Sequence, residues 1–239
     1  MLDYLLTKTL QIVLGAPSAW VMKNRYPIST SSTLRPVDLT FMKKAPFWYF
    51  EVGNIMASVS YFLPQLWIPS FAASQHFPSY SGPLALSLLN IAACGGYLLQ
   101  GILVDRFHVT LAILVATLGS VIAIFIFWGL TASQPMLYVF AIVWGLSGGG
   151  FAGNWSGCAK AMKDSSRHLD TGLIISFMCT GKGIASLASG PISERLLRAG
   201  GLNGAQFAYG TQYGIIILFA GVTAMLGGIS CIGRLFKVL

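Results

Sequence analysis

Six long, continuous apolar runs constrain the fold of this chain more than any other feature. They cover about residues 47–71, 84–104, 109–130, 136–158, 172–193 and 212–233. An α-helix of about 20 apolar residues crosses the hydrocarbon core of a bilayer, which is about 30 Å thick. An open sheet would leave backbone groups unsatisfied in lipid, and the strands of a barrel would alternate polar and apolar residues. We therefore predict an all-α, polytopic membrane bundle of about six transmembrane helices.

The composition agrees with a membrane protein and argues against a nucleic-acid-binding one. Charged residues make up 9% of the 239 residues and hydrophobic residues 55%, whereas soluble domains contain about 25% charged residues. The formal net charge is +8, but the basic residues cluster in the gaps between apolar runs. That distribution is typical of membrane topology. We expect the lipid bilayer as a partner, and no nucleic acid.

The charges of the connections predict the topology. The connections at 72–83 and 131–135 contain no charged residue, whereas those at 105–108 and 159–171 carry basic residues. This alternation fits six spans with both termini in the cytoplasm. The connection at 194–211 is the exception, because it contains two arginines on the predicted outer side.

The chain divides into an N-terminal part, 1–46, and the helical bundle, 47–239. Residues 1–22 contain a short apolar run that a lysine and a proline interrupt. We interpret it as a membrane-surface helix or as the stump of a preceding span. Residues 23–46 are polar and predict a cytoplasmic linker.

Small residues repeat at helical spacing in the fourth run. The repeat consists of Gly145, Gly149, Gly153 and Gly157. Residues four apart lie on one face of a helix, and glycines there let a neighbouring backbone come close. The face serves either static packing or sliding between transport states. The sequence does not separate these two interpretations.

Lys182 lies near the middle of the run 172–193, between two glycines. A lysine at the centre of a membrane helix costs roughly 2.5–3.5 kcal/mol on insertion scales, so it should face the bundle interior or a water-filled cavity. It either binds or couples a substrate, or it forms a structural ion pair or snorkels. Glu51 is its candidate partner within the chain, although the favoured interpretation places Glu51 at the headgroup level.

Several amide side chains within or near the predicted spans are further candidates. They are Asn54, Asn90, Asn154 and Gln65. Each lines a substrate cavity or hydrogen-bonds a neighbouring helix, an interaction that contributes about 0.6 kcal/mol on average in one membrane protein.

The second run ends in residues 101–107 (GILVDRF). This stretch resembles the Gly-x-Leu-x-Asp-Arg-x-Gly signature of major facilitator superfamily transporters, and departs from it where His108 replaces a glycine. The glycine allows tight helix contact, and an acid at a helix end can engage a facing helix N-terminus or a base. We therefore predict a gating motif made of Gly101, Asp105 and Arg106.

Longer stretches resemble the fungal monocarboxylate-transporter-like members of that superfamily. Residues 60–72 are similar to their seventh helix, 90–101 to their eighth and 181–194 to their eleventh. Together they cover about 47–236 and imply the C-terminal six-helix half of a twelve-helix transporter. Residues 5–15 resemble the start of the sixth helix, shortened.

The resemblance implies roles for individual residues. Lys182 stands where relatives often have arginine, so the positive charge remains without the bidentate fork. Tyr97 stands where many relatives carry an arginine in the eighth helix. The implied substrate-binding or coupling residues are Lys182, Tyr97, Asn90 and Asn54.

Two functions remain open. The first is a secondary transporter of a small organic anion or metabolite, proton-coupled, in the plasma membrane, and completed by a missing N-terminal half or a second copy. The alternative is a truncated, non-transporting paralogue or fragment. An enzyme is disfavoured, because no histidine lies on a helix face with a carboxylate and no zinc-protease motif occurs. We expect no metal and no cofactor.

Overall fold

The computed structural model describes residues 13, 16–17, 39–164, 170–202 and 204–235. The chain forms two units, Met1–Asp38 and Leu39–Leu239. The membrane-surface helix predicted at 1–22 and most of the predicted linker fall in the first unit, almost entirely outside the described residues. The account below concerns the second unit.

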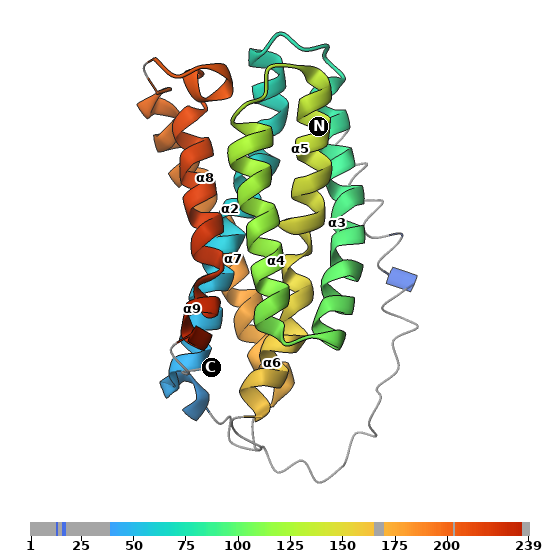
Figure 1. The fold of residues 1–239 in the computed structure, drawn as a ribbon, viewed down its shortest axis with the longest axis vertical. Helices are drawn as coiled ribbons and strands as arrows, with labels where there is room; N and C mark the ends of the chain where they lie inside the picture. Colours follow the sequence, from blue (N-terminus) through green and yellow to red (C-terminus); the bar gives the residue numbers. More distant parts are fainter. Residues whose placement is uncertain (1–12, 14–15, 18–38, 165–169, 203, 236–239) are drawn as a thin grey trace. The chain divides into compact units, whose positions relative to one another are not determined.

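The second unit is helical in every regular element that the described residues form, which confirms the predicted all-α class (Figure 1). Its α-helices are α2 (Ala45–Ser74), α3 (Ser81–Arg106), α4 (Val109–Ile122), α5 (Gln134–Ser147), α6 (Trp155–Asp164), α7 (Thr171–Ala199), α8 (Gly214–Gly227) and α9 (Ile229–Leu235). The 3-10 helices are η1 (Thr40–Lys43), η3 (Gly149–Asn154) and η4 (Phe207–Gly210), and η2 (Ala123–Trp128) is a π-helix that continues α4.

The six predicted apolar runs correspond to α2, α3, α4 with η2, α5 through α6, α7, and α8 with α9. Five of these stretches are long and apolar enough to cross a membrane. The sixth, α2, has 30 residues but is more polar, because it contains Glu51, Asn54 and Gln65. The chain is an integral, multi-pass membrane protein.

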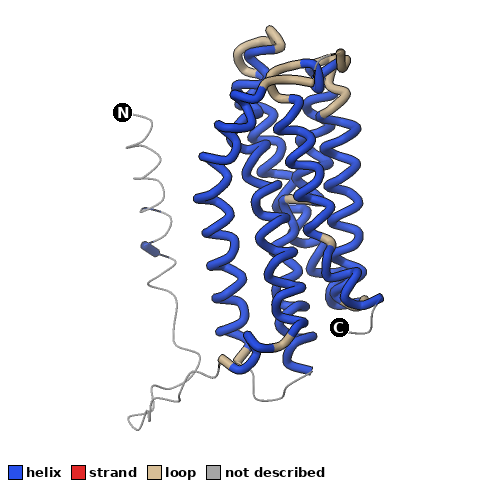
Figure 2. The backbone as a smooth tube through the Cα atoms, turned by 90° about the vertical axis from the view of Figure 1, so that its left-hand side faces the viewer, coloured by secondary structure: helices blue, strands red, loops and turns tan. Residues whose placement is uncertain are grey.

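The helices run side by side, and their connections gather at two ends of the bundle (Figures 1 and 2). The α2–α3, η2–α5 and α7–α8 connections lie at one end, and the α3–α4 connection lies at the other. Successive connections thus lie at alternate ends of the bundle, as the charges of the connections predicted. One of the two arginines at the exceptional end, Arg198, forms an ion pair with Glu194 at 2.6 Å. Which end faces the cytoplasm stays a prediction.

The glycine face of the fourth run packs against α3, as predicted. A Cβ atom added to Gly149 would lie 2.7 Å from the Cβ of Ala93, and one added to Gly153 would lie 3.2 Å from the Cβ of Gln100. On the α3 side, a Cβ on Gly96 would lie 2.6 Å from the carbonyl oxygen of Leu146. The two backbones are therefore close enough to require glycine at this contact.

The fourth run lies within one membrane-spanning stretch, Gln134–Lys163, but this stretch is not one regular α-helix. The helix is interrupted after Ser147, and Gly149–Asn154 forms the 3-10 helix η3 before α6 begins. Three consecutive glycines, 148–150, lie where this segment begins, and glycine is the least favourable helix former after proline. Contact with α3 compensates for the weakened helix, because the glycines let the two backbones approach.

Two apolar clusters form the core, with polar side chains between them. The larger cluster contains Val59 of α2 and Ala185 of α7, and the smaller contains Phe50 of α2 and Met178 of α7. On both helices the stretch between the clusters carries the polar residues, including Lys182. This polar layer is where the candidate site lies.

Candidate functional site

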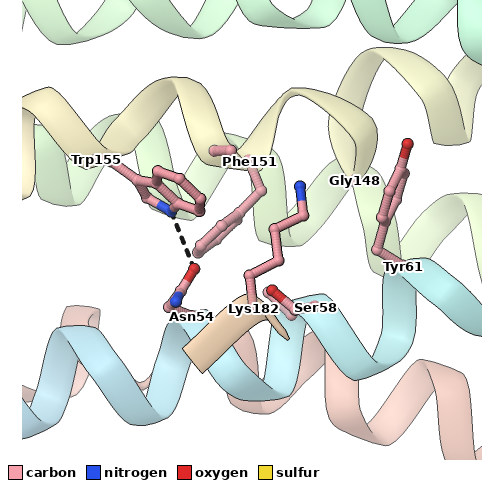
Figure 3. A pocket seen from close by; sticks show the side chains of 9 residues that line it. Asn54, Ser58, Tyr61, Gly148, Phe151, Trp155 and Lys182 are labelled. Carbon is pink, nitrogen blue, oxygen red and sulfur yellow. Dashed lines mark hydrogen bonds between the residues drawn. The ribbon is translucent and has the colours of Figure 1, made fainter. Parts of the chain in front are cut away.

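Lys182 projects from α7 toward the interrupted helix and is partly buried (Figure 3). Its Nζ atom lies 5.3 Å from the ring centroid of Tyr61 on α2 and 5.7 Å from that of Trp155 at the start of α6. The negative faces of aromatic rings attract an ammonium group. The expectation that Lys182 faces the bundle interior is confirmed, and its immediate neighbours are aromatic.

A small cavity surrounds the Lys182 side chain. Its lining comes from α2, the interrupted helix and α7, namely Asn54, Ala57, Ser58, Tyr61, Gly148, Phe151, Ala152, Trp155 and Lys182. The free volume is about 10 Å³, which is room for about one water molecule. The described residues alone thus place a cation in a partly open, partly polar pocket that is too small for an organic molecule.

Asn54 holds the cavity wall together. Its side chain is fully buried, its Nδ2 donates to the carbonyl of Met178 at 2.8 Å, and its Oδ1 accepts from Trp155 Nε1 at 2.9 Å (Figure 3). One amide therefore joins α2 to α7 and to α6. The interpretation that Asn54 hydrogen-bonds neighbouring helices is confirmed, and its contact with a substrate stays a prediction.

Three aromatic residues of the cavity were not among the predicted site residues. Tyr61, Phe151 and Trp155 all line the cavity. No sequence signal singled out Trp155, because it lies near the end of the run 136–158, where tryptophans usually anchor helices.

Asn90 and Tyr97 do not reach the cavity. Both lie on an exposed face of α3, and the side chain of Tyr97 is 41% exposed. The Nδ2 atom of Asn90 donates to Leu86 of its own helix at 2.9 Å. Their role in substrate binding stays a prediction, one that requires this face of α3 to line a pathway.

Glu51 forms no ion pair with Lys182, and its expected place at the headgroup level stays a prediction. Its side chain is only 6% exposed and is enclosed by protein. A Cβ atom at Gly181 would overlap Oε1, so the missing side chain of that glycine provides the space for the carboxyl group. No ion pair with Glu51 is found among the described residues.

Comparison with known proteins gives one relative of named function. The chain is 25% identical to an MFS-type transporter of Aspergillus fumigatus over 205 residues, which are 84% of this chain and 43% of the relative. The similarity supports a transporter of the major facilitator type. The chain spans less than half the length of this relative, and the narrower resemblance to monocarboxylate-transporter-like members stays a prediction. No family model and no solved structure matches the chain.

The predicted gating motif lies at the end of α3. Asp105 and Arg106 are exposed there, and they form no ion pair with another described residue. A Cβ atom on Gly101 would meet no atom within 4 Å, so no helix of the described part of the chain packs closely against this glycine. The role of these residues as a gating motif stays a prediction.

The departure from the signature at His108 has a local structural explanation. His108 is the N-cap of α4, and its Nδ1 accepts the backbone N–H of Thr110 at 3.2 Å. A cap of this kind satisfies one of the unpaired N–H groups at the start of a helix. His108 therefore begins α4 where the signature has a glycine.

Proposed function

We propose that this chain is one six-helix half of a secondary transporter, and that it moves a small organic anion by alternating access with proton coupling. The observation that carries the proposal is Lys182, a cation in the middle of a membrane helix with no carboxylate paired to it among the described residues. A charged side chain in the middle of a membrane helix costs free energy of insertion, and such residues usually mark substrate or ion pathways. The similarity to a major facilitator transporter supports the same function.

The anion would bind where the Lys182 cavity meets a second six-helix unit. The cavity within this chain holds about one water molecule, so an organic anion needs space between two units. Transporters of this type bind substrate near the midplane, at the interface of their repeats. Asn90 and Tyr97 would border that space from the exposed face of α3.

Uptake by vesicles tests the proposal. The full chain is reconstituted in vesicles together with a second six-helix unit, either a second copy or the missing N-terminal half. Uptake of labelled acetate, lactate and pyruvate is then compared with uptake of glucose, a neutral control. We expect Lys182→Ala to lower anion uptake by about tenfold or more, because a hydrogen bond to a charged group contributes about 1.5–3 kcal/mol. Lys182→Arg should retain part of the uptake, since it keeps the charge.

Lys160→Ala is the matched control. Lys160 lies on α6, is exposed and does not line the cavity, so its removal should leave uptake unchanged. Equal uptake by wild type and Lys182→Ala would contradict the assignment of Lys182 as the anion-binding residue.

The second candidate function is a membrane protein that keeps the fold without transport. The small cavity favours it, as does the absence of Asn90 and Tyr97 from the cavity lining. It predicts no uptake of any tested anion by folded protein, even when a second six-helix unit is supplied.

A further inference from the structure

The Glu51 carboxyl group is buried with an incomplete set of partners. The side chain is 6% exposed, and Oε2 has no hydrogen-bond partner among the described residues. Its other oxygen, Oε1, lies against the backbone of Gly181, the residue before Lys182. The carboxyl group therefore lies next to the backbone that carries the site's cation.

No cation neutralises this carboxyl group in the conformation described. Lys182 of α7 directs its ammonium group toward the rings of Tyr61 and Trp155. From α6, the buried Cys158 thiol faces Glu51, while Lys160 and Lys163 of that helix are exposed.

An ionised carboxylate in such a place is far more costly than the neutral acid. Burying a charge without a partner carries a large desolvation penalty, and a buried group usually neutralises instead. The neutral acid can also donate its own proton in a hydrogen bond. The geometry therefore favours a carboxyl group that carries a proton while Lys182 points away from it.

We propose that Glu51 is the proton-binding site of this transporter, and that its proton is exchanged according to the charge at Lys182. The proposal rests on the function proposed above. With no anion bound and the Lys182 ammonium turned toward Glu51, this carboxyl group releases its proton, and the ammonium and the carboxylate then sum to zero charge. With one monovalent anion on Lys182, zero net charge requires a proton on Glu51.

This balance gives one proton carried with each anion. The proton enters Glu51 from the water on the side where the anion binds, and leaves to the water on the side where the anion is released. Gly181 makes the arrangement possible, because any side chain there would displace the carboxyl group from its place beside Lys182.

Labelling with dicyclohexylcarbodiimide tests the proton site without a known substrate. This apolar reagent reacts with protonated carboxyl groups, and the modified peptide is identified by mass spectrometry. The purified full chain is labelled across a pH series, alongside Glu51→Gln and Glu194→Gln. Glu194 is the matched control, because it is exposed and paired with Arg198.

We expect labelling of Glu51 that declines as pH rises, persists in Glu194→Gln and is absent in Glu51→Gln. Infrared difference spectra between acid and alkaline samples should show the carbonyl stretch of a protonated acid, lost in Glu51→Gln. Absence of both signals in folded protein at every pH overturns the proposal.

The link to Lys182 is tested with two variants. Lys182→Met removes the positive charge that favours the carboxylate, so the midpoint of Glu51 labelling should move to higher pH by about one unit or more. Lys182→Arg should keep the wild-type midpoint. An unchanged midpoint in Lys182→Met overturns the proposed exchange.

The outcomes separate this proposal from the proposed function. Labelling of Glu51 with the expected dependence on Lys182, but without uptake of any anion, keeps the proton site and overturns transport. Uptake that depends on Lys182, without Glu51 labelling, keeps transport and overturns the proton site.

Discussion

Asn54 shows how much of this site depends on one side chain. It is fully buried, and its two hydrogen bonds reach Met178 and Trp155 on different elements. Trp155 in turn presents its ring to the Lys182 ammonium. The position of the cation is thus fixed through a chain of contacts from α2 to α6 to α7.

Replacing Asn54 should destabilise the bundle. Asn54→Leu leaves the Trp155 N–H and the Met178 carbonyl without their partner, and we expect a loss of about 1–2 kcal/mol for the two bonds together. The measurement is reversible unfolding in detergent micelles. Asn90→Leu is the control, because Asn90 bonds only its own helix and should change stability little. Equal losses in the two variants would contradict the bridging role of Asn54.

At the scale of elements, α3 has two functional faces. One face packs against the interrupted helix α5–η3–α6 through Gly96 and its neighbours. The other face is exposed and carries Asn90, Cys94, Tyr97 and Asp105 at helical spacing. Exposed apolar residues lie beside them, namely Leu84, Ile91, Leu98, Leu99 and Ile102. Polar residues in a membrane helix are candidates for a pathway or an interface, and that role of this face stays a prediction.

Alanine substitutions should distinguish the two faces. In Gly96→Ala the new methyl group would lie 2.6 Å from the Leu146 carbonyl oxygen, so we expect destabilisation by about 1–3 kcal/mol. Gly101→Ala enters open space and should leave stability unchanged or raise it by up to about 1 kcal/mol. Thermal unfolding of the purified variants provides both values. Similar destabilisation by both variants would show that Gly101 is also in close contact.

Native cysteines allow a test of whether the exposed face of α3 meets water. Cys94 lies on that face and is exposed, whereas Cys158 is buried. We expect a charged, water-soluble methanethiosulfonate reagent to modify Cys94 and to leave Cys158 unmodified in intact vesicles. Mass spectrometry of the peptides measures both. Protection of Cys94 from the charged reagent, combined with reaction toward an apolar maleimide, would place this face in lipid.

At the scale of the whole molecule, coverage by other helices is uneven. In the stretch Gly214–Cys231, which covers α8 and the start of α9, 56% of residues are buried, against 22% in the most apolar parts of α3 and of α7. The Lys182 site lies on α7, and the predicted gating motif lies on α3. Among the five stretches compared, the two least covered are thus those that carry Lys182 and the predicted gating motif.

Dilution in the membrane tests the need for a second unit. If two copies form the transporter, uptake of labelled lactate per mass of protein should fall as the chain is reconstituted at lower protein-to-lipid ratio. A tandem fusion of two copies should remove that dependence. Uptake that appears only with a different six-helix unit would instead identify that unit as the partner. Uptake independent of dilution would show that the chain works alone.

Several features of this protein followed from the sequence alone, because they depend on local properties. The length and apolarity of a run decide whether it crosses a membrane, so the six helices and the all-α class were predictable. The spacing of glycines in the fourth run indicated its close contact with a neighbour. The cost of a charge in a membrane helix likewise singled out Lys182.

The tertiary structure alone decided which polar groups meet. Asn54 and Trp155 are 101 positions apart in the chain, and no local pattern relates them. Packing placed Asn54 and Lys182 in the wall of one cavity and kept Asn90 and Tyr97 out of its lining. It also buried Glu51 beside Gly181. The physical reason is that a side chain's partners depend on how helices rotate and approach one another, and this is decided jointly by residues on all of them.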